Sequence, residues 1–396
     1  MTSAILAAAL LPVFAQEAAS PLETPVGTNG DYQSLVLAVR RATTVDPKRA
    51  GRLAGLLPRL DPVIYWDDRN VPAVSREAFR GARDFALAEW GQVLGGFKPR
   101  IVTSPAAAAG GLSFSFETRL AQGAGATHFA DQNATTPRLE TVLGLRRGEF
   151  YTGQIDVHNE VLFAVGTYFG LLPNKGFGGA MGRTDRTTSL GTSPRANEAL
   201  LADQTFTQAT AIRKAIANGQ RLSPGSPKLW VETKSLDLGV RVQGQPAETS
   251  FTVANNGNGP MSLQVLGDCA CLSAMGPTRL EAGESGVVRA RYNTAQVGGS
   301  LKHQVLIRTT DPEQPVIGVT MNLAVRTLAR FIVPGGPTLM PTDGAPVDLY
   351  FVTDPSKPVK IKSAQADGMP GDLTSEPWQG TLADADLAEG PLPREG

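Results

Sequence analysis

The chain has 396 residues with 37 basic and 37 acidic side chains, so no overall field favours nucleic acid or anionic lipid. It is long enough for two or three domains with cores of their own. Its ligand-forming side chains are few, and they exclude a Cys-rich zinc site and a disulfide framework: His128, His158, His303, Cys269 and Cys271. We therefore expect no nucleic-acid partner and no bound cofactor.

An apolar run from Ala4 to Phe14 is followed by Ala15, which with Val13 forms the small-residue pattern of a signal peptidase site. The pattern predicts a signal peptide over residues 1–15 and a secreted or periplasmic mature protein. The alternative is a short disordered terminus, because no Lys or Arg precedes the run. No later stretch has the roughly 18 apolar residues needed to span a bilayer.

Residues 16–60 are predicted to be an N-terminal extension in which residues 35–41 indicate a helix. A strand is expected at residues 62–67. Ser75 can cap a following helix that runs to about Gly95. Apolar residues at three- and four-residue spacing predict that one side of this helix faces a core: Phe79, Ala82, Phe85, Ala86, Trp90 and Val93.

Two further strands are expected at residues 99–103 and 112–116, the second from its alternation of apolar and polar side chains. A second helix is predicted to start at Asp156, whose carboxylate can cap it, and to end near Gly170. Its surface is so apolar that we expect it to be buried. A third helix over residues 196–219 can supply core contacts from Ala199, Leu200, Phe206, Ala209 and Ile212. This order of elements predicts an α+β domain with a mixed sheet.

The second helix has the frame of a His-Glu-x-x-His-x-x-Gly-x-x-His zinc motif. In that motif two imidazoles one helical turn apart share a face, a glycine turns the chain, and a third imidazole returns to the metal. With the motif glycine placed at Gly170, the three His positions hold Phe163, Thr167 and Pro173, and the general-base position holds Ala164. The segment therefore has no zinc ligands.

The span of about residues 62–219 resembles the matrixin branch of the metzincin zinc proteases. Its landmarks follow one another as they do in that family: Ala86-Leu-Ala-Glu-Trp90 on the long helix, Leu112-Ser-Phe-Ser-Phe116 on a sheet strand, the helix from Asp156 into Gly170-Leu171, and Met181 eight residues after the last ligand position. The resemblance implies a mixed sheet with three helices over residues 61–219, and a methionine beneath the lost metal. Because the ligands and the catalytic Glu are absent, no activity carries over.

A different ligand set for a metallopeptidase can be tried from Asp156, His158 and Glu160. Asp156 and Glu160 are four residues apart and share a helical face, whereas His158 points elsewhere. We favour an acidic first turn that complements the helix dipole. Met181, without a metal above it, is then a core methionine.

Residues 220–228 are predicted to be a linker, after which short strands separated by turn residues predict an immunoglobulin-like β-sandwich over residues 229–326. Strands are expected at residues 229–231, 248–253, 263–266, 287–292, 304–309 and 318–325. The span resembles the bacterial branch of the ASH and major-sperm-protein-like immunoglobulin domains, through Leu238-Gly239, Phe251-x-Val-x-Asn-x-Gly257, Cys269-Ala-Cys271, Gly283-Glu-Ser-Gly286 and Thr309-Thr-Asp-Pro312. Domains of this kind are accessory or scaffold modules, which implies binding and not catalysis.

The thiol pair Cys269 and Cys271, with one residue between them, can bind copper(I) or change state by oxidation. We favour a pair of buried or half-buried thiols, or a short-range disulfide without a duty, because no His or Met cluster lies near them in the sequence.

Residues 327–367 resemble the opening strands of a further sandwich, whose unpaired edges should pack on the preceding domain or on a partner. Residues 368–396 are predicted to be a mobile acidic tail. We expect an exported, non-catalytic binding or scaffold protein with a protein or cell-envelope partner. By analogy with the family, the partner would bind in the old substrate cleft between strand 112–116 and the helix at Phe163. The alternatives are a metallopeptidase with atypical ligands and a thiol or copper protein.

Overall fold

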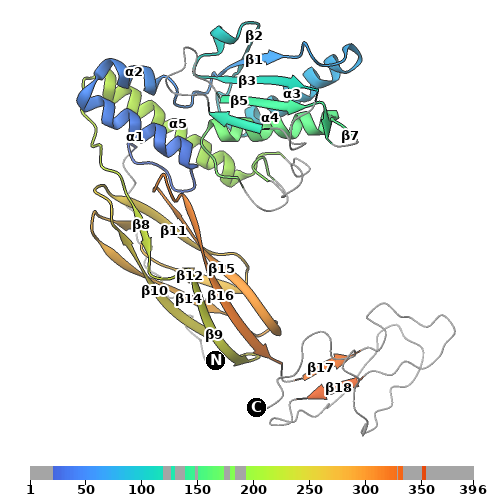
Figure 1. The fold of residues 1–396 in the computed structure, drawn as a ribbon, viewed down its shortest axis with the longest axis vertical. Coiled ribbons are helices and arrows are strands. Elements are labelled where there is room, and N and C mark those ends of the chain that lie inside the picture. Colours follow the sequence, from blue (N-terminus) through green and yellow to red (C-terminus); the bar gives the residue numbers. More distant parts are fainter. Residues whose placement is uncertain are drawn as a thin grey trace, which may run out of the picture. The chain divides into compact units, whose positions relative to one another are not determined.

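The computed structural model describes residues 21–118, 126–129, 139–147, 150–173, 179–182, 193–327, 329–332 and 350–353. The chain forms two compact units, Met1–Gly225 and Ser226–Gly396. Figure 1 labels the elements of both. The predicted signal peptide and the predicted acidic tail lie outside the described residues.

A five-stranded mixed sheet forms the centre of the first unit, in the order β2-β1-β3-β5-β4. Four strands run parallel, and the edge strand β4 pairs antiparallel with β5. The register places Trp66 opposite Phe114, and Leu112 opposite Leu139. The strands are β1 (Val63–Asp67), β2 (Arg100–Val102), β3 (Leu112–Glu117), β4 (Ala126–Phe129) and β5 (Leu139–Gly144), followed by a short hairpin of β6 (Arg146–Arg147) and β7 (Phe150–Tyr151).

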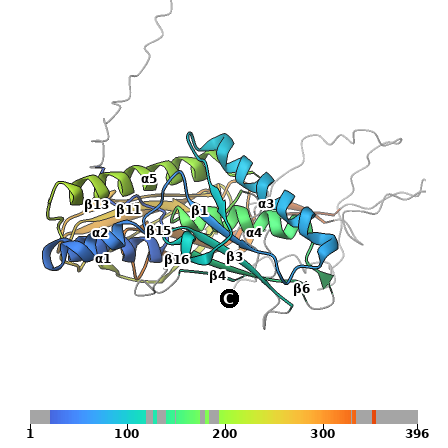
Figure 2. The same cartoon turned by 90° about the horizontal axis from the view of Figure 1, so that it is seen from above.

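The helices of the first unit form two groups, which Figures 1 and 2 show from two directions. The helices α3 and α4 share one hydrophobic core with the strands. The helices α1, α2 and α5 enclose a second apolar cluster around Tyr32. The bounds are α1 (Gly30–Val45), α2 (Pro47–Ala54), α3 (Ala73–Val93), α4 (Gln154–Tyr168) and α5 (Ala196–Ala217), with a short 3₁₀ turn at Pro105–Ala108.

The N-terminal extension is part of this unit, and it adds α1 and α2 to the three helices expected over residues 61–219. Asn29 caps α1, because its side chain accepts a hydrogen bond from the Tyr32 amide. Asp46 caps α2 by accepting from the Arg49 amide, and Pro47 takes the first helical position, where it loses no hydrogen bond. The resulting helices are longer than the single helix predicted at residues 35–41.

Two predicted helix starts and three predicted core residues are wrong. The helix α3 begins after Pro72, without a side-chain cap from Ser75. Asp156 is the third residue of α4, where its carboxylate accepts from the amide of the N-cap Gly153. Phe85, Val93 and Leu200 are exposed over 60%, 38% and 59% of their surface, because the core-facing stripe of each helix is narrower than its full apolar pattern.

The second unit is a sandwich of two sheets, with strand orders β12-β14-β10-β8 and β13-β11-β15-β16-β9. On β14, burial alternates from residue to residue, so that Val288, Ala290 and Tyr292 face the core. The strands are β8 (Leu229–Val231), β9 (Ser235–Val242), β10 (Ala247–Asn255), β11 (Met261–Gly267), β12 (Leu272–Met275), β13 (Arg279–Leu280), β14 (Ser285–Tyr292), β15 (Gly299–Thr309) and β16 (Val316–Arg326). All six predicted strands are confirmed.

Three strands of the sandwich, β9, β12 and β13, are not predicted from the sequence. The strand β9 contains Gly239 at a φ of +67°, and it pairs parallel with β16 across a register shift between Asn322 and Ala324. A glycine and a bulge interrupt the simple alternation on which the prediction relies.

Beyond the sandwich, β17 (Ala329–Ile332) pairs antiparallel with β18 (Tyr350–Thr353). Within the described part of the chain, no helix is both long enough and apolar enough to cross a membrane.

Asn255 connects three segments of the sandwich and is fully buried. Its amide nitrogen donates to the carbonyls of Gly259, Leu280 and Glu281 at 2.8–3.2 Å. Its oxygen accepts from the amides of Lys228 and Gly257. A single side chain thereby satisfies backbone groups of the segment before β8, of the β10–β11 turn and of the segment at the end of β13.

We expect Asn255→Ala to lower the free energy of unfolding by about 3 kcal/mol, because it strands buried backbone donors and acceptors. Chemical unfolding of the full chain measures the effect. Asn256→Ala is the matched control, since Asn256 is exposed. Equal stability of the two variants would contradict the role of Asn255.

Candidate functional site

The positions at which the zinc motif would place ligands lie on α4 and just beyond it. Phe163 is only 4% exposed and belongs to the core of the first unit, together with Ala164. The Thr167 hydroxyl donates to the Phe163 carbonyl at 2.9 Å, so it bonds within its own helix. Pro173 is exposed, after the turn at Gly170. Phe163 and Ala164 therefore pack in the core, and Thr167 makes a local hydrogen bond.

The motif glycine, Gly170, anchors the N-terminal extension. It has a φ of +77°, and a Cβ there would lie 2.5 Å from Cγ of Tyr32. The Asn29 amide donates to the Gly170 carbonyl at 2.6 Å. Burial raises the pKa of Tyr32, whose protonated hydroxyl is bonded to Gln208 at 2.6 Å. The end of α4 is therefore joined to α1 through Gly170 and Tyr32, and Tyr32 connects α1 to α5. In the zinc motif, the chain would turn back to the metal at this glycine.

Met181 packs against α4. It is 1% exposed, and a Cβ on Gly166 would lie 2.2 Å from its sulfur and 3.3 Å from Cζ2 of Trp90. The Trp90 indole donates to the Leu162 carbonyl at 3.0 Å. Because Gly166 has no side chain, α4 can lie close to both Met181 and Trp90 at this position.

The turn that carries Met181 is held by Glu198, a residue that the sequence analysis did not single out. Its buried carboxylate accepts from the amides of Ala180 at 2.9 Å, Met181 at 3.0 Å and Arg195 at 2.8 Å. A Glu three residues after the N-cap is the sequence signal of a capping box, and it marks this position.

The alternative ligands Asp156, His158 and Glu160 do not converge. Asp156 bonds to the Gly153 amide, and Glu160 is buried. His158 Nε2 lies 2.6 Å from a carboxylate oxygen of Glu89 on α3. Among the described residues, the only group of three or more side chains placed to hold a metal ion is in the second unit.

The cleft predicted between strand 112–116 and the helix at Phe163 is filled. Leu112, Phe114 and Phe116 of β3 are at most 1% exposed and lie in the same hydrophobic core as Phe163. The side chains that the strand alternation turns toward α4 occupy the space themselves. The analogy with the family's substrate cleft is therefore wrong for this pair of elements.

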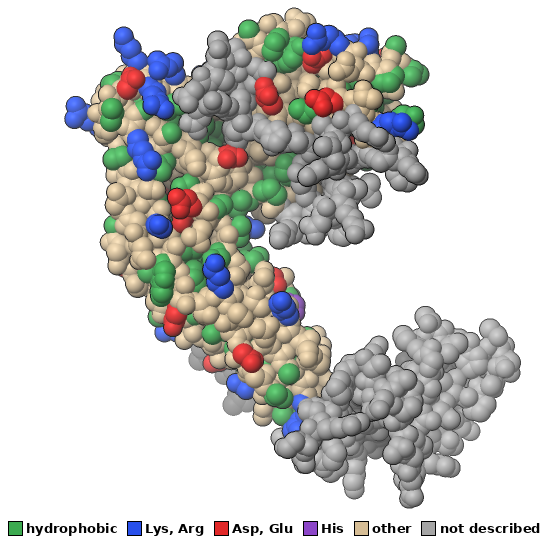
Figure 3. Space-filling view, viewed as in Figure 1, with side chains coloured by type: hydrophobic (Ala, Val, Ile, Leu, Met, Phe, Trp, Pro, Cys, Tyr) green, Lys and Arg blue, Asp and Glu red, His purple; other side chains and the backbone are tan. Residues whose placement is uncertain are grey.

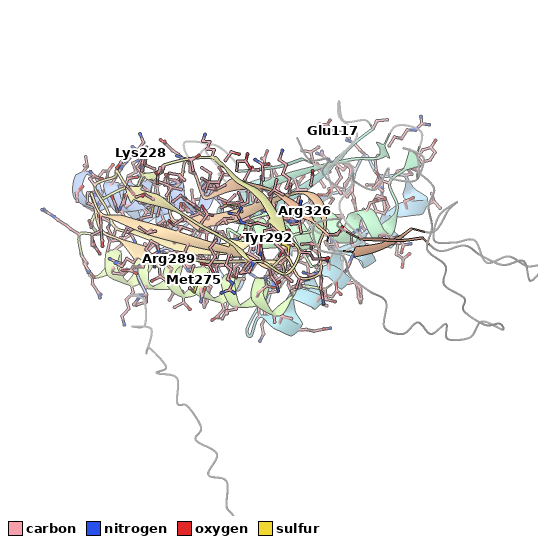
Figure 4. All side chains as sticks on the ribbon, turned by 90° about the horizontal axis from the view of Figure 1, so that it is seen from below. Glu117, Lys228, Met275, Arg289, Tyr292 and Arg326 are labelled. Atoms are coloured by element: carbon pink, nitrogen blue, oxygen red, sulfur yellow. A yellow bond between two sulfur atoms is a disulfide. The ribbon has the colours of Figure 1, made fainter. Side chains whose placement is uncertain are left out.

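In the second unit, Cys269 and Cys271 form a disulfide, and both are half-buried. The Tyr292 hydroxyl lies 3.1 Å from the sulfur of Cys271. Burial, with a smaller contribution from the charge of Asp268, raises the pKa of Tyr292, so its hydroxyl stays protonated and donates to the sulfur. Figure 4 labels Tyr292 among the strands of the sandwich.

A histidine also lies beside the two sulfurs. The His303 ring packs against the Tyr292 ring at a tilt of 53°, with 5.5 Å between centroids, and its Nδ1 lies 3.0 Å from a carboxylate oxygen of Asp268. One ring nitrogen of His303 and both sulfurs lie within 4.8 Å of one another. No His or Met cluster lies near the cysteines in the sequence, but the pairing of β15 with β11 brings His303 to them in the fold.

The match to a family model lies in the second unit. Residues 229–323 match a family model described as a protein of unknown function (DUF1573). No curated protein matches the chain. Among solved structures, a protein of unknown function from Porphyromonas gingivalis W83 is 23% identical, with a TM-score of 0.23, over 25% of this chain and 46% of the other. The match therefore spans less than half of that protein.

Two further structures match similar shares of the chain. The ASH/PapD-like domain 7 of human CEP192 is 12% identical, with a TM-score of 0.22, over 26% of this chain and 87% of that domain. The secreted serine protease VesC from Vibrio cholerae is 20% identical, with a TM-score of 0.21, over 24% of this chain and 23% of the protease.

We expect Gly166→Ala to destabilise the protein by about 1–3 kcal/mol through overpacking against Met181 and Trp90. In a Met181→Ala background the same change should cost at least about 1 kcal/mol less, because only the 3.3 Å approach to Trp90 Cζ2 remains and the helix propensity of Ala offsets it. Thermal unfolding of the four proteins of this double-mutant cycle measures the coupling.

The matched control is Gly81→Ala on α3, where an added Cβ meets nothing within 4 Å. It should stabilise the protein in both backgrounds. Additive effects of Gly166→Ala and Met181→Ala would contradict the contact.

Proposed function

We propose that this protein is an exported, non-catalytic binding or scaffold protein. Its first unit is a metzincin-like domain of the matrixin branch that has lost its zinc site, and its second is an immunoglobulin-like module. The proposal rests on what the residues at the zinc-ligand positions of the motif do in this structure. Phe163 is buried in the core, and Thr167 bonds to its own helix.

The order and packing of elements support the metzincin-like frame. A strand leads into the helix with Trp90, the strand β3 follows, and α4 ends in the turn at Gly170. Met181 then packs against α4, as the family's methionine lies beneath its metal, and α5 closes the unit. These agreements explain why the chain keeps the spacing of a zinc motif without the ligands.

The chemistry supports a loss of catalysis. In a zinc peptidase the metal lowers the pKa of a bound water so that a Glu can deprotonate it. Here Ala164 stands at the Glu position, and the described side chains around α4 provide no group of three metal ligands. A peptide bond held there would meet neither an activated water nor a base.

The second unit and the surface charge favour a protein or cell-envelope partner over a nucleic acid. On the face of the second unit shown in Figure 3, acidic and basic side chains are interspersed. Basic and acidic residues are equal in number over the whole chain. Such a surface lacks the one-signed field that attracts polyanions. The apolar run at residues 4–14 supports export.

Metal analysis of the full chain, purified without chelator, tests the proposal directly. We expect substoichiometric zinc and no peptidase activity on unfolded protein substrates. One zinc per chain, with peptidase activity lost to a chelator and restored by zinc, would overturn it.

Restoring the ligands tests the frame. In a variant with Phe163→His, Ala164→Glu, Thr167→His and Pro173→His, we expect one Zn²⁺ per chain and a zinc-dependent rise in the unfolding temperature, because the metal binds only the folded state. The matched control retains Pro173 and should bind zinc at least tenfold more weakly.

Circular dichroism decides whether the rebuilt chain is folded, since Phe163 is a core residue. A folded variant that binds zinc no better than the original chain contradicts the metzincin-like frame. The metal analysis of the original chain remains informative whichever way the variant folds.

A further inference from the structure

We propose that Cys269, Cys271 and His303 form a redox-gated site for copper(I), closed by the disulfide and opened by a dithiol reductant. The site lies within the second unit. It is independent of the proposed loss of catalysis in the first.

The donor atoms are already together in the oxidised chain. Both sulfurs and a nitrogen of His303 lie within 4.8 Å of one another, from the β11–β12 connection and from β15. Asp268 contacts Nδ1 of His303 at 3.0 Å, which favours a proton on Nδ1 and a lone pair on Nε2. A carboxylate that orients a ligating imidazole in this way is a recurrent feature of metal sites.

The disulfide holds the site closed, because sulfurs bonded to each other are not thiolate ligands. It is also accessible, since Cys269 and Cys271 are half-buried and Ala270 between them is exposed. Its two cysteines are only two positions apart in the chain, so the bond removes little entropy from the unfolded state. The hydrophobic core of the sandwich extends through both sheets, and the fold should survive reduction.

Reduction follows thiol–disulfide exchange. A thiolate of the dithiol attacks Cys269, and the S–S bond breaks with its electron pair on Cys271. The Tyr292 hydroxyl, 3.1 Å from that sulfur, stabilises the departing thiolate. The second thiol of the reductant then closes the reductant's own disulfide and releases Cys269. The chain takes up two electrons and two protons, and the dithiol is oxidised.

Two thiolates and one imidazole are a soft donor set that suits copper(I). Binding displaces the two thiol protons into solvent. A structural zinc site needs four ligands, and the carboxylate of Asp268 is engaged with His303. The site therefore favours copper(I) over zinc.

The test is an anaerobic titration of the full chain, after reduction with a phosphine and desalting. Copper(I) is added in competition with the chromophoric chelator bicinchoninate. We expect one copper(I) per reduced chain and none per oxidised chain. Cys269→Ser/Cys271→Ser should abolish binding, and His303→Gln should weaken it about tenfold or more. Met275→Leu, which removes a 73% exposed thioether on β12, should leave binding unchanged.

Three outcomes overturn the proposal. One is copper(I) binding that is the same in the reduced and oxidised chains, and another is binding that persists in the double Ser variant. The third is a reduced, folded chain that binds no copper(I), or that takes up Zn²⁺ in its place. Circular dichroism of each reduced sample confirms that the chain is folded.

The gate is tested separately by the rate at which dithiothreitol reduces the native chain, followed by alkylation and mass measurement. We expect reduction without denaturant, and a several-fold lower rate for Tyr292→Phe, which keeps the buried ring and removes only the hydroxyl. Reduction that requires denaturant overturns the gate. If the reduction rate of Tyr292→Phe is unchanged, the Tyr292 hydroxyl does not stabilise the departing thiolate of Cys271.

Discussion

The close approach of α4 to Met181 and Trp90 at Gly166 is the constraint on which the first unit depends. A glycine inside a helix costs about 1 kcal/mol relative to Ala, so its use here indicates that the space matters more than helix propensity. Because α4 lies this close to Met181 and Trp90, its side chains pack in the hydrophobic core of the first unit. Phe163 is one of these core residues. The helix α4 therefore serves packing.

The same logic explains the turn at Gly170. A glycine with positive φ is what the zinc motif needs to return its third ligand, and here it permits close contact with Tyr32. The contact ties α1 to the end of α4, and Tyr32 connects onward to Gln208 of α5. The positive φ of Gly170 thus serves the contact between the end of α4 and the N-terminal extension.

The two units thus differ in their capacity for chemistry. In the first, the motif positions are filled by side chains that pack or bond within the chain. In the second, two sulfurs, an imidazole, a carboxylate and a phenol lie together at one end of β11 and β15. A binding role for the first unit and a metal or redox role for the second are therefore compatible in one protein.

The sequence by itself determined what depends on local spacing: the buried helix that ends before Gly170, the stripe of Phe79 and Trp90, and the main strands of the sandwich. Only the tertiary structure decided which apolar side chains are exposed, such as Phe85, and that His303 lies beside the cysteines. The physical reason is that helix and strand periodicity act between near neighbours in the chain. Burial and ligand geometry depend on which distant segments pack together, and no local pattern records that.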